Sequence, residues 1–376
     1  MKHTCQLLLA LAIVGVAPVS AARHGDEAAL YAAIRELGLD PEAIAEPLRM
    51  NDAMREWLAA EIPPGLPVSL KMQRLLHRLL LPDGLGLHYE VGFTGTAQEV
   101  FTAAAGNCLG FTQMFVAMGR ELGFDIYYLA VDELTRFRRE SDLIIVSDHV
   151  TAAFNEGPKR RILEFSLGPD YDYRTAREVN DLEGLALYYS NRGAELVQER
   201  DFRRAQGQLE IAVKLAPGLA QAWVNLGVAR RRRGDLAGAE ADYRRAIEED
   251  KDQLSAYHNL AGLYRLQGRE DPAGEILSIL TSRKNRNPFV FLQLGDMILH
   301  QTRVAEAERF YRRAVRLGRE HAETHAAYGL WYLDSGETQQ ARRQLKRAER
   351  RDRHERRTVE LRERLAELEL ARAPAG

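Results

Sequence analysis

The chain has 376 residues, of which 45% are hydrophobic and 28% charged, and its net charge is −2. These values are typical of ordinary folded protein, and the length suffices for two or three domains with cores of their own. The near-balance of charge excludes a global field that would draw the chain to nucleic acid or to an anionic membrane, so we expect no nucleic-acid partner.

The first 22 residues have the pattern of a signal peptide. A basic start precedes an apolar run from Leu7 to Val16, and small residues lead to a cleavage site after Ala21 or Ala22. An uncleaved anchor is the alternative, but the run is shorter than the roughly 20 residues that span a bilayer. We therefore assign residues 1–22 to a cleavable signal peptide outside the fold. The mature protein is then expected to be periplasmic or secreted, with no membrane span.

Cleavage would remove Cys5 and leave Cys108 as the one cysteine of the mature chain. A leftover cysteine in an exported protein indicates a reactive thiol or an intermolecular bridge. The alternative is a buried structural cysteine, because free cysteine is among the most buried residue types. The lone cysteine by itself does not distinguish a reactive or bridging thiol from a structural one.

Helical patterns lead up to the cysteine. Thr96 and Glu99 have the spacing of a capping box, which predicts a short helix beginning there. Asn51 is a good N-cap for the second of three earlier helices. The predicted helices before the capping box cover residues 26–36, 51–61 and 68–81.

Cys108 is predicted to lie in the first turn of a helix. Asn107 is a plausible N-cap, and Gly123 is a good residue to end the helix. Unpaired backbone N–H groups and the positive end of the helix dipole favour a thiolate at this position, and the same groups could hold an oxyanion. The apolar face of the helix consists of Phe111, Phe115, Met118 and Leu122.

Strand patterns follow at 125–131, 143–146, 149–154 and 160–165. If Phe154 pairs with Lys159 across a four-residue loop, His149 and Glu164 become direct neighbours on one face. A carboxylate beside an imidazole fixes its tautomer, as in a nucleophile–base–acid triad. The alternative is a surface His–Glu pair without chemistry. The fallback acids are Asp148 and Asp170.

Residues from about 89 to 165 resemble the transglutaminase-like branch of the papain-type cysteine enzymes. The shared landmarks are Thr94 to Ala97, Gly106-Asn107-Cys108 opening a helix, and His149 starting a strand. The resemblance implies a papain-like, transglutaminase-like α+β domain over residues 24–167. It also implies that Cys108 is the nucleophile, His149 the general base and acid, and Glu164 the orienting acid, where the family has aspartate.

The C-terminal half repeats itself every 34 residues. Aromatic or histidine residues, small residues and bulky residues each recur at this step. Small residues where two helices cross, with bulky ones between them, indicate stacked helical pairs. The repeating positions are Tyr189, Trp223, Tyr257, Phe291 and His325; Gly193, Gly227, Ala261, Gly295 and Gly329; Ala205, Ala239, Ala273, Ala307 and Ala341; Leu209, Tyr243, Leu277, Tyr311 and Leu345; and Ala212, Ala246, Leu280, Ala314 and Ala348.

This pattern resembles tetratricopeptide repeats, and residues 223–227 are close to their signature. We expect a linker at 168–185, five repeats at 186–355 and a capping helix at 356–372, joined as an all-α solenoid to the N-terminal domain. The resemblance implies a protein or peptide partner on a concave groove. By analogy, the groove residues are Asn225, Arg231, Arg232, His258 and Arg265.

Two functions follow from these patterns. The first is an exported thiol enzyme acting on amide bonds, a peptidase or amidase rather than a crosslinking acyl transferase, whose repeats recruit its substrate or partner. The alternative is a non-catalytic transglutaminase-like platform whose repeats hold envelope proteins together. The sequence has no phosphate-cradling glycine loop and no metal-ligand spacing, so no cofactor or metal is expected.

Overall fold

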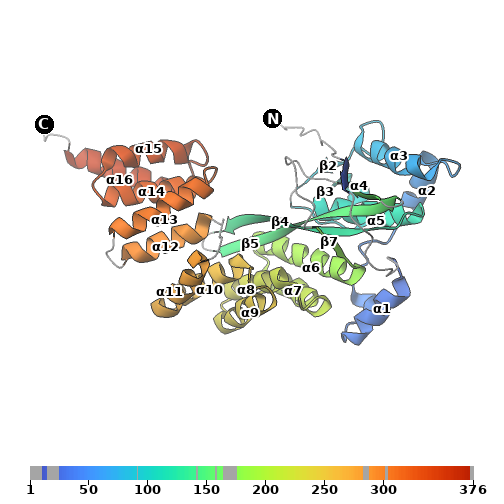
Figure 1. The fold of residues 1–376 in the computed structure, drawn as a ribbon, viewed down its shortest axis with the longest axis horizontal. Helices are drawn as coiled ribbons and strands as arrows, with labels where there is room; N and C mark the ends of the chain where they lie inside the picture. Colours follow the sequence, from blue (N-terminus) through green and yellow to red (C-terminus); the bar gives the residue numbers. More distant parts are fainter. Residues whose placement is uncertain are drawn as a thin grey trace. The chain divides into compact units, whose positions relative to one another are not determined.

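A computed structural model describes residues 11–14, 25–90, 92–140, 143–156, 159–163, 176–282, 288–300 and 304–372. The chain divides into two compact units, Met1–Gln253 and Leu254–Gly376, and most of the described residues are helical (Figure 1). The boundary falls within the repeats, between the second and the third.

Short helices open the first unit, and all but α3 (Val68–Leu80) have a side-chain hydrogen bond at the N-cap. Asn51 accepts a hydrogen bond from the Met54 backbone at 2.9 Å. The capping box forms as the sequence predicts, with Glu99 accepting from the Thr96 backbone at 2.7 Å and Thr96 accepting from Glu99 at 3.3 Å. These helices are α1 (Glu27–Glu36), η1 (Pro41–Ala43), α2 (Asp52–Glu61), α3 (Val68–Leu80) and α4 (Ala97–Ala103).

An antiparallel sheet of five strands follows, in the order β1-β6-β5-β4-β7. β4 and β5 form a long two-stranded ribbon (Figure 1), with an irregularity between Val131 and Arg136. The strands expected at 143–146 and 149–154 are therefore one continuous strand. The bounds are β1 (Leu11–Val14), β4 (Ile126–Glu140), β5 (Leu143–Glu156), β6 (Lys159–Leu163) and β7 (Arg177–Val179); a separate parallel pair joins β2 (His88–Tyr89) to β3 (Ala105–Gly106).

Part of the N-terminal apolar run belongs to this sheet. β1 pairs antiparallel with β6, from Leu11 opposite Leu163 to Val14 opposite Arg160. This corrects the expectation that residues 1–22 lie outside the fold. The physical reason is that β6 would otherwise present unpaired backbone groups at a sheet edge, which an uncharged apolar segment can satisfy. Cleavage after Ala21 or Ala22 stays a prediction, and it would remove β1 from the mature chain.

The register of the β5–β6 hairpin differs from the predicted one by two residues. Phe154 pairs with Arg161, not with Lys159, and Glu156 is the residue opposite Lys159. The strands continue to within two residues of each other, so the connection is shorter than the four residues assumed. Leu163 consequently lies opposite Ala152, and the register that made His149 and Glu164 neighbours is wrong.

The core of the first unit lies between the sheet and α5 (Cys108–Glu121). Most of α5 is buried, and a Cβ on Gly119 would lie 2.9 Å from the Ile126 side chain, which shows how closely helix and sheet pack. The rings of Phe124 and Phe154 meet edge-to-face at 5.4 Å. The core residues shared by helix and sheet include Phe111, Met114, Phe115, Met118, Ile126, Ala152, Phe154 and Leu163.

The first repeat helix, α6 (Asp181–Gln198), is packed into this core. Arg120 of α5 makes a bidentate ion pair with Asp181 at 2.7 and 2.8 Å. A Cβ on Gly184 would lie 2.7 Å from the ring of Tyr128 on β4. The predicted linker at 168–185 thus contains β7 and the first turn of α6, and both contact the N-terminal elements.

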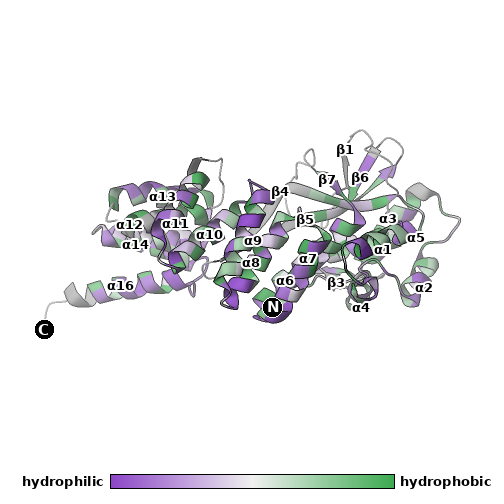
Figure 2. Ribbon diagram, turned by 90° about the horizontal axis from the view of Figure 1, so that it is seen from below, coloured by the Kyte–Doolittle hydropathy of each residue, from purple (hydrophilic) through white to green (hydrophobic). Residues whose placement is uncertain are grey.

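Paired helices make up the rest of both units. Hydrophilic residues predominate along the last helix (Figure 2), but its Leu361 and Leu365 are buried against the preceding pair. The remaining helices of the first unit are α7 (Phe202–Leu215), α8 (Ala220–Arg232) and α9 (Leu236–Glu249). Those of the second are α10 (Leu254–Leu266), α11 (Glu270–Ser282), α12 (Pro288–His300), α13 (Val304–Leu317), α14 (Ala322–Asp334), α15 (Thr338–Glu349) and α16 (Arg356–Arg372).

The recurring glycines lie where paired helices touch. A Cβ added to Gly193 would lie 2.4 Å from Leu209, and one added to Gly227 would lie 2.5 Å from the ring of Tyr243. Each of these contacts is between a small and a bulky position of the 34-residue step. The spacing of the sequence therefore reflects real helix–helix contacts.

We expect Gly227→Ala to lower the free energy of unfolding by about 1–3 kcal/mol, because the fully buried Tyr243 ring must move to admit the methyl group. Gly207 of α7 is the matched control, since it is exposed and nothing lies within 4 Å of its Cβ position. Gly207→Ala should raise stability by up to about 1 kcal/mol, because alanine favours the helix. Urea unfolding followed by circular dichroism measures both; equal shifts of the same sign would contradict the packing argument.

Candidate functional site at Cys108

Cys108 is the first residue of α5 and is partly exposed. Asn107 is the N-cap, as the sequence predicts, and its Oδ1 accepts from the Gly110 backbone at 3.0 Å. The Asn107 backbone in turn donates to the Phe93 carbonyl at 2.9 Å. The thiol therefore lies at the end of a helix where backbone N–H groups and the dipole favour negative charge.

A buried chain of hydrogen bonds fixes this turn. Asn107 Nδ2 donates to Thr94 Oγ1 at 2.6 Å, and Thr94 donates from its hydroxyl (2.6 Å) and backbone (2.8 Å) to Glu195 Oε1. Arg192 donates to the other oxygen of Glu195 at 2.6 Å. Burial raises the pKa of Glu195, although Thr94 and Arg192 oppose the shift. The first repeat helix thus holds the turn that presents the cysteine.

Sequence reasoning missed Glu195, although the repeat spacing held a signal. The equivalent positions of the later repeats are apolar, so a charge at this point of the first repeat departs from the pattern. A buried carboxylate needs partners, and here they are Arg192, three positions away, and Thr94, 101 positions away. The equivalent residues are Ala229, Leu263, Met297 and Trp331.

Thr112 links the start of α5 to the strand that carries His149. Its hydroxyl lies 2.7 Å from the Cys108 carbonyl and 3.3 Å from the Val150 carbonyl. His149 is the preceding residue of β5, and its backbone pairs with Val131 of β4. The structure therefore brings the helix of the predicted nucleophile against the strand of the predicted base.

The acid of the predicted triad falls on a part of the chain that the structure does not describe. Glu164 and the fallback residue Asp170 both lie outside the described residues. Asp148 lies on β5, next to His149. With the hairpin register corrected, the orienting role of Glu164 depends on the family resemblance alone and stays a prediction.

The residues expected to face an open groove are mostly buried. Asn225 and His258 are 1% and 0% exposed, and Arg231 is 8% exposed. Asn225 lies 3.5 Å from the Ser190 hydroxyl of the neighbouring helix. In the first unit α8 also lies against β5, which contributes to this burial. Asn225 and His258 therefore do not present an open binding surface, which corrects the expectation; Arg232 and Arg265 are only partly buried.

No helix in the described part of the chain is both long and apolar enough to cross a membrane. Among the same residues, no three or more His, Cys, Asp or Glu side chains gather in a way that could hold a metal ion.

Comparison with known proteins identifies the paired helices. A family model described as tetratricopeptide repeat matches residues 191–256. The chain contains tetratricopeptide repeats. The matched range covers the end of α6 through the start of α10, and thus includes the repeat whose helices α8 and α9 meet at Gly227 and Tyr243.

The curated relatives share only a part with this chain. It is 31% identical over 144 residues to cellulose synthase operon protein C of Xanthomonas axonopodis pv. citri (strain 306), which covers 34% of this chain and 10% of the relative. It is 34% identical over 89 residues to protein O-mannosyl-transferase TMTC1 of Mus musculus, covering 24% and 9%. This chain thus spans about a tenth of the length of these relatives.

Solved structures resemble about half of the chain. The PilF protein of Pseudomonas aeruginosa is 23% identical, with a TM-score of 0.43, and covers 50% of this chain and 85% of its own. A thermophilic TPR protein of Thermus thermophilus is 20% identical, with a TM-score of 0.42, and covers 49% and 99%.

Proposed function

We propose that this chain is a protein-binding scaffold in which tetratricopeptide repeats recruit a protein partner and the N-terminal α/β unit serves as a rigid platform. The observation that carries the proposal is the repeat array itself, since stacked helical pairs of this kind present extended surfaces to partners. The integration of α6 into the N-terminal core supports the platform role. We further propose that the scaffold acts in the periplasm or outside the cell.

Photo-crosslinking at matched exposed positions tests the scaffold. A photoreactive amino acid replaces Leu266, 61% exposed at the end of α10, or Leu70, 46% exposed on α3, outside the repeats. We expect protein crosslinks in living cells at position 266 and few at position 70. Equal yields at the two positions, or no crosslink from the repeats, would argue against partner recruitment by this array.

Thiol chemistry at Cys108 is a second candidate function. It is favoured by the partly exposed thiol at the capped start of α5, beside the strand of His149. Together with the resemblance to transglutaminase-like enzymes, this supports a Cys108 nucleophile acting on amide bonds, with His149 as the base and Glu164 as the orienting acid. The acyl-enzyme would be resolved by water, because nothing identifies an amine site.

Alkylation kinetics distinguish the two candidates. In a Cys5→Ser chain, so that Cys108 is the reacting cysteine, we expect the alkylation rate to report a thiol pKa below the ordinary value of about 8.5, because the helix N-terminus favours the thiolate. His149→Ala should change the pH profile, whereas His88→Ala, at an exposed residue of β2, should not. A profile with an ordinary pKa that is insensitive to His149→Ala would eliminate the thiol enzyme and leave the scaffold untouched.

A further inference from the structure

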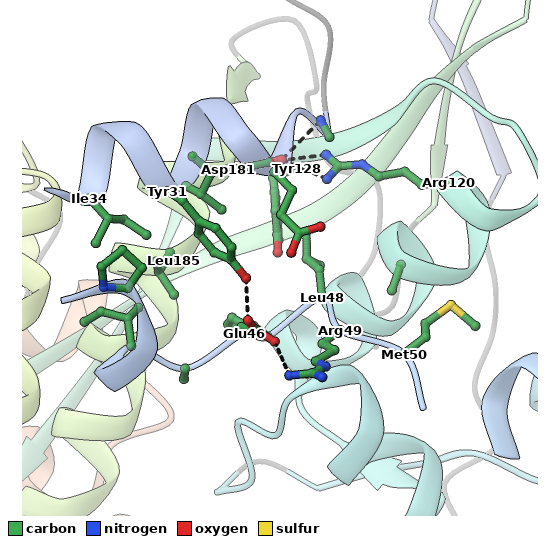
Figure 3. A pocket seen from close by; sticks show the side chains of 18 of the residues that line it. Tyr31, Ile34, Glu46, Leu48, Arg49, Met50, Arg120, Tyr128, Asp181 and Leu185 are labelled. Carbon is green, nitrogen blue, oxygen red and sulfur yellow. Dashed lines mark hydrogen bonds and ion pairs between the residues drawn. The ribbon is translucent and has the colours of Figure 1, made fainter. Parts of the chain in front are cut away.

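A cavity of about 550 Å³ lies in the first unit (Figure 3). Its walls come from α1, the segment around η1, the C-terminal part of α5 and the start of α6. The lining residues Ala117 and Arg120 follow Cys108 by nine and twelve positions, so about 13–18 Å of helix separates them from it. Much of the lining is apolar, including Ile34, Leu48, Met50, Ala117 and Leu185.

Two pairs of the charged groups that line this cavity are ion pairs. Arg120 and Asp181 form the bidentate pair described above, and Asp181 also accepts from the Gly25 backbone at 3.2 Å. Glu46 accepts from the Tyr31 hydroxyl and from Arg49, the latter at 2.9 Å (Figure 3). A ligand with a net charge would have to compete with these partners, so the lining favours a neutral one.

Tyr128 of β4 brings a hydroxyl group to the lining of the cavity. Its side chain is 1% exposed to solvent and lines the cavity. Burial raises the pKa of Tyr128, and the nearby Asp181 raises it further, so the hydroxyl remains a donor. A hydroxyl in the lining can donate a hydrogen bond to an acceptor oxygen of a bound molecule, which favours a ligand that carries one such oxygen.

We propose that this cavity binds a neutral, mainly apolar small molecule with one hydroxyl or carbonyl oxygen, which accepts a hydrogen bond from Tyr128. The volume is within the range of about 300–1,000 Å³ that is usual for small-molecule sites. The apolar part of the lining would contact the ligand's body, and the charges that are already paired leave the tyrosine hydroxyl to set its orientation. The site is independent of partner recruitment and of the thiol.

A pair of probes of similar shape tests the proposal on the full chain. 1-Acetylnaphthalene carries a carbonyl, and 1-ethylnaphthalene lacks it; each is titrated against bound N-phenyl-1-naphthylamine, a neutral fluorescent reporter. We expect the ketone to displace the reporter at lower concentration. Tyr128→Phe should weaken the ketone about 2- to 10-fold and leave the hydrocarbon unchanged, because the variant loses one hydrogen bond and no volume.

Two further variants locate the probes. Ala117→Leu fills the cavity and should weaken both, whereas Leu266→Ser removes a large exposed apolar side chain of the second unit and should change neither. The proposal is overturned if the reporter does not bind, or if Tyr128→Phe affects ketone and hydrocarbon alike. Because Tyr128→Phe adds no atoms to the core, its outcome decides the matter even if Ala117→Leu fails to fold.

Discussion

Replacing Arg357 with alanine is expected to destabilise the unit Leu254–Gly376 by about 3–5 kcal/mol. Arg357, at the start of α16, makes a bidentate ion pair with Asp296 of α12, with one N–O distance of 3.0 Å, and lies 3.4 Å from Glu323 of α14. Asp296 also accepts from the Tyr311 hydroxyl at 2.9 Å. Alanine would remove the cation that contacts both of these largely buried carboxylates.

Arg364 of the same helix is the matched control. It pairs with Asp334 at 2.5 Å, but both side chains are more than a third exposed, so Arg364→Ala should cost less than about 1 kcal/mol. Thermal unfolding of the full chain, with hydrogen exchange of α12 to α16, measures the two losses. Equal losses of stability for both variants would show that the buried ion pair stabilises the protein no more than the exposed one.

The stabilisation by the Arg357–Asp296 ion pair should decrease at low pH. Burial alone would raise the pKa of Asp296, but Arg357 holds it below its ordinary value. The wild-type contribution is therefore complete above the unfolded pKa of about 3.9 and is lost as the pH falls through the lower folded value. The difference between wild type and Arg357→Ala should shrink at low pH and not at high pH.

Loss of the Glu195 carboxylate is expected to cost about 2–5 kcal/mol in the first unit, because Glu195→Ala leaves two Thr94 donors and Arg192 without their shared acceptor. Glu195→Gln keeps an acceptor for Thr94 and should lose much less. Urea unfolding gives the two losses, and hydrogen exchange over residues 93–112 reports whether the cysteine turn loosens. Unchanged exchange in Glu195→Ala would contradict the bracing role.

The pH dependence of Glu195 is opposite to that of Asp296. Its folded pKa is raised by burial, so the folded state holds a proton that the unfolded chain releases near pH ~4.3. Its contribution is therefore largest below that pH and declines as the pH rises through the raised folded value. Glu195→Gln should abolish this part of the pH dependence.

Local signals predicted much of the fold. The Thr96 capping box and the Asn107 cap depend on residues three positions apart, and both form as expected. The repeat spacing identified helix contacts such as Gly227 with Tyr243, because each repeat must bury the same face. In these cases the interacting groups are close in sequence or recur with a fixed period.

The site was less predictable because its parts are distant in sequence. The register of the β5–β6 hairpin depended on the length of one connection, and a two-residue error removed the argument that paired His149 with Glu164. Glu195 contacts Thr94, which lies 101 positions away, so no pattern among neighbouring residues predicts this contact. The pairing of Leu11–Val14 with β6 likewise depends on an open edge that forms only after folding.

The place of α6 in the N-terminal core bears on how this gene can change over time. Its Asp181, Gly184 and Glu195 each contact residues of the α/β part, so the first repeat cannot be duplicated or deleted without loss of that core. The later repeats belong to a separate compact unit, Leu254–Gly376. Lineages of this protein should therefore vary in repeat number at the C-terminal end and keep the first repeat as a fixed part of the N-terminal fold.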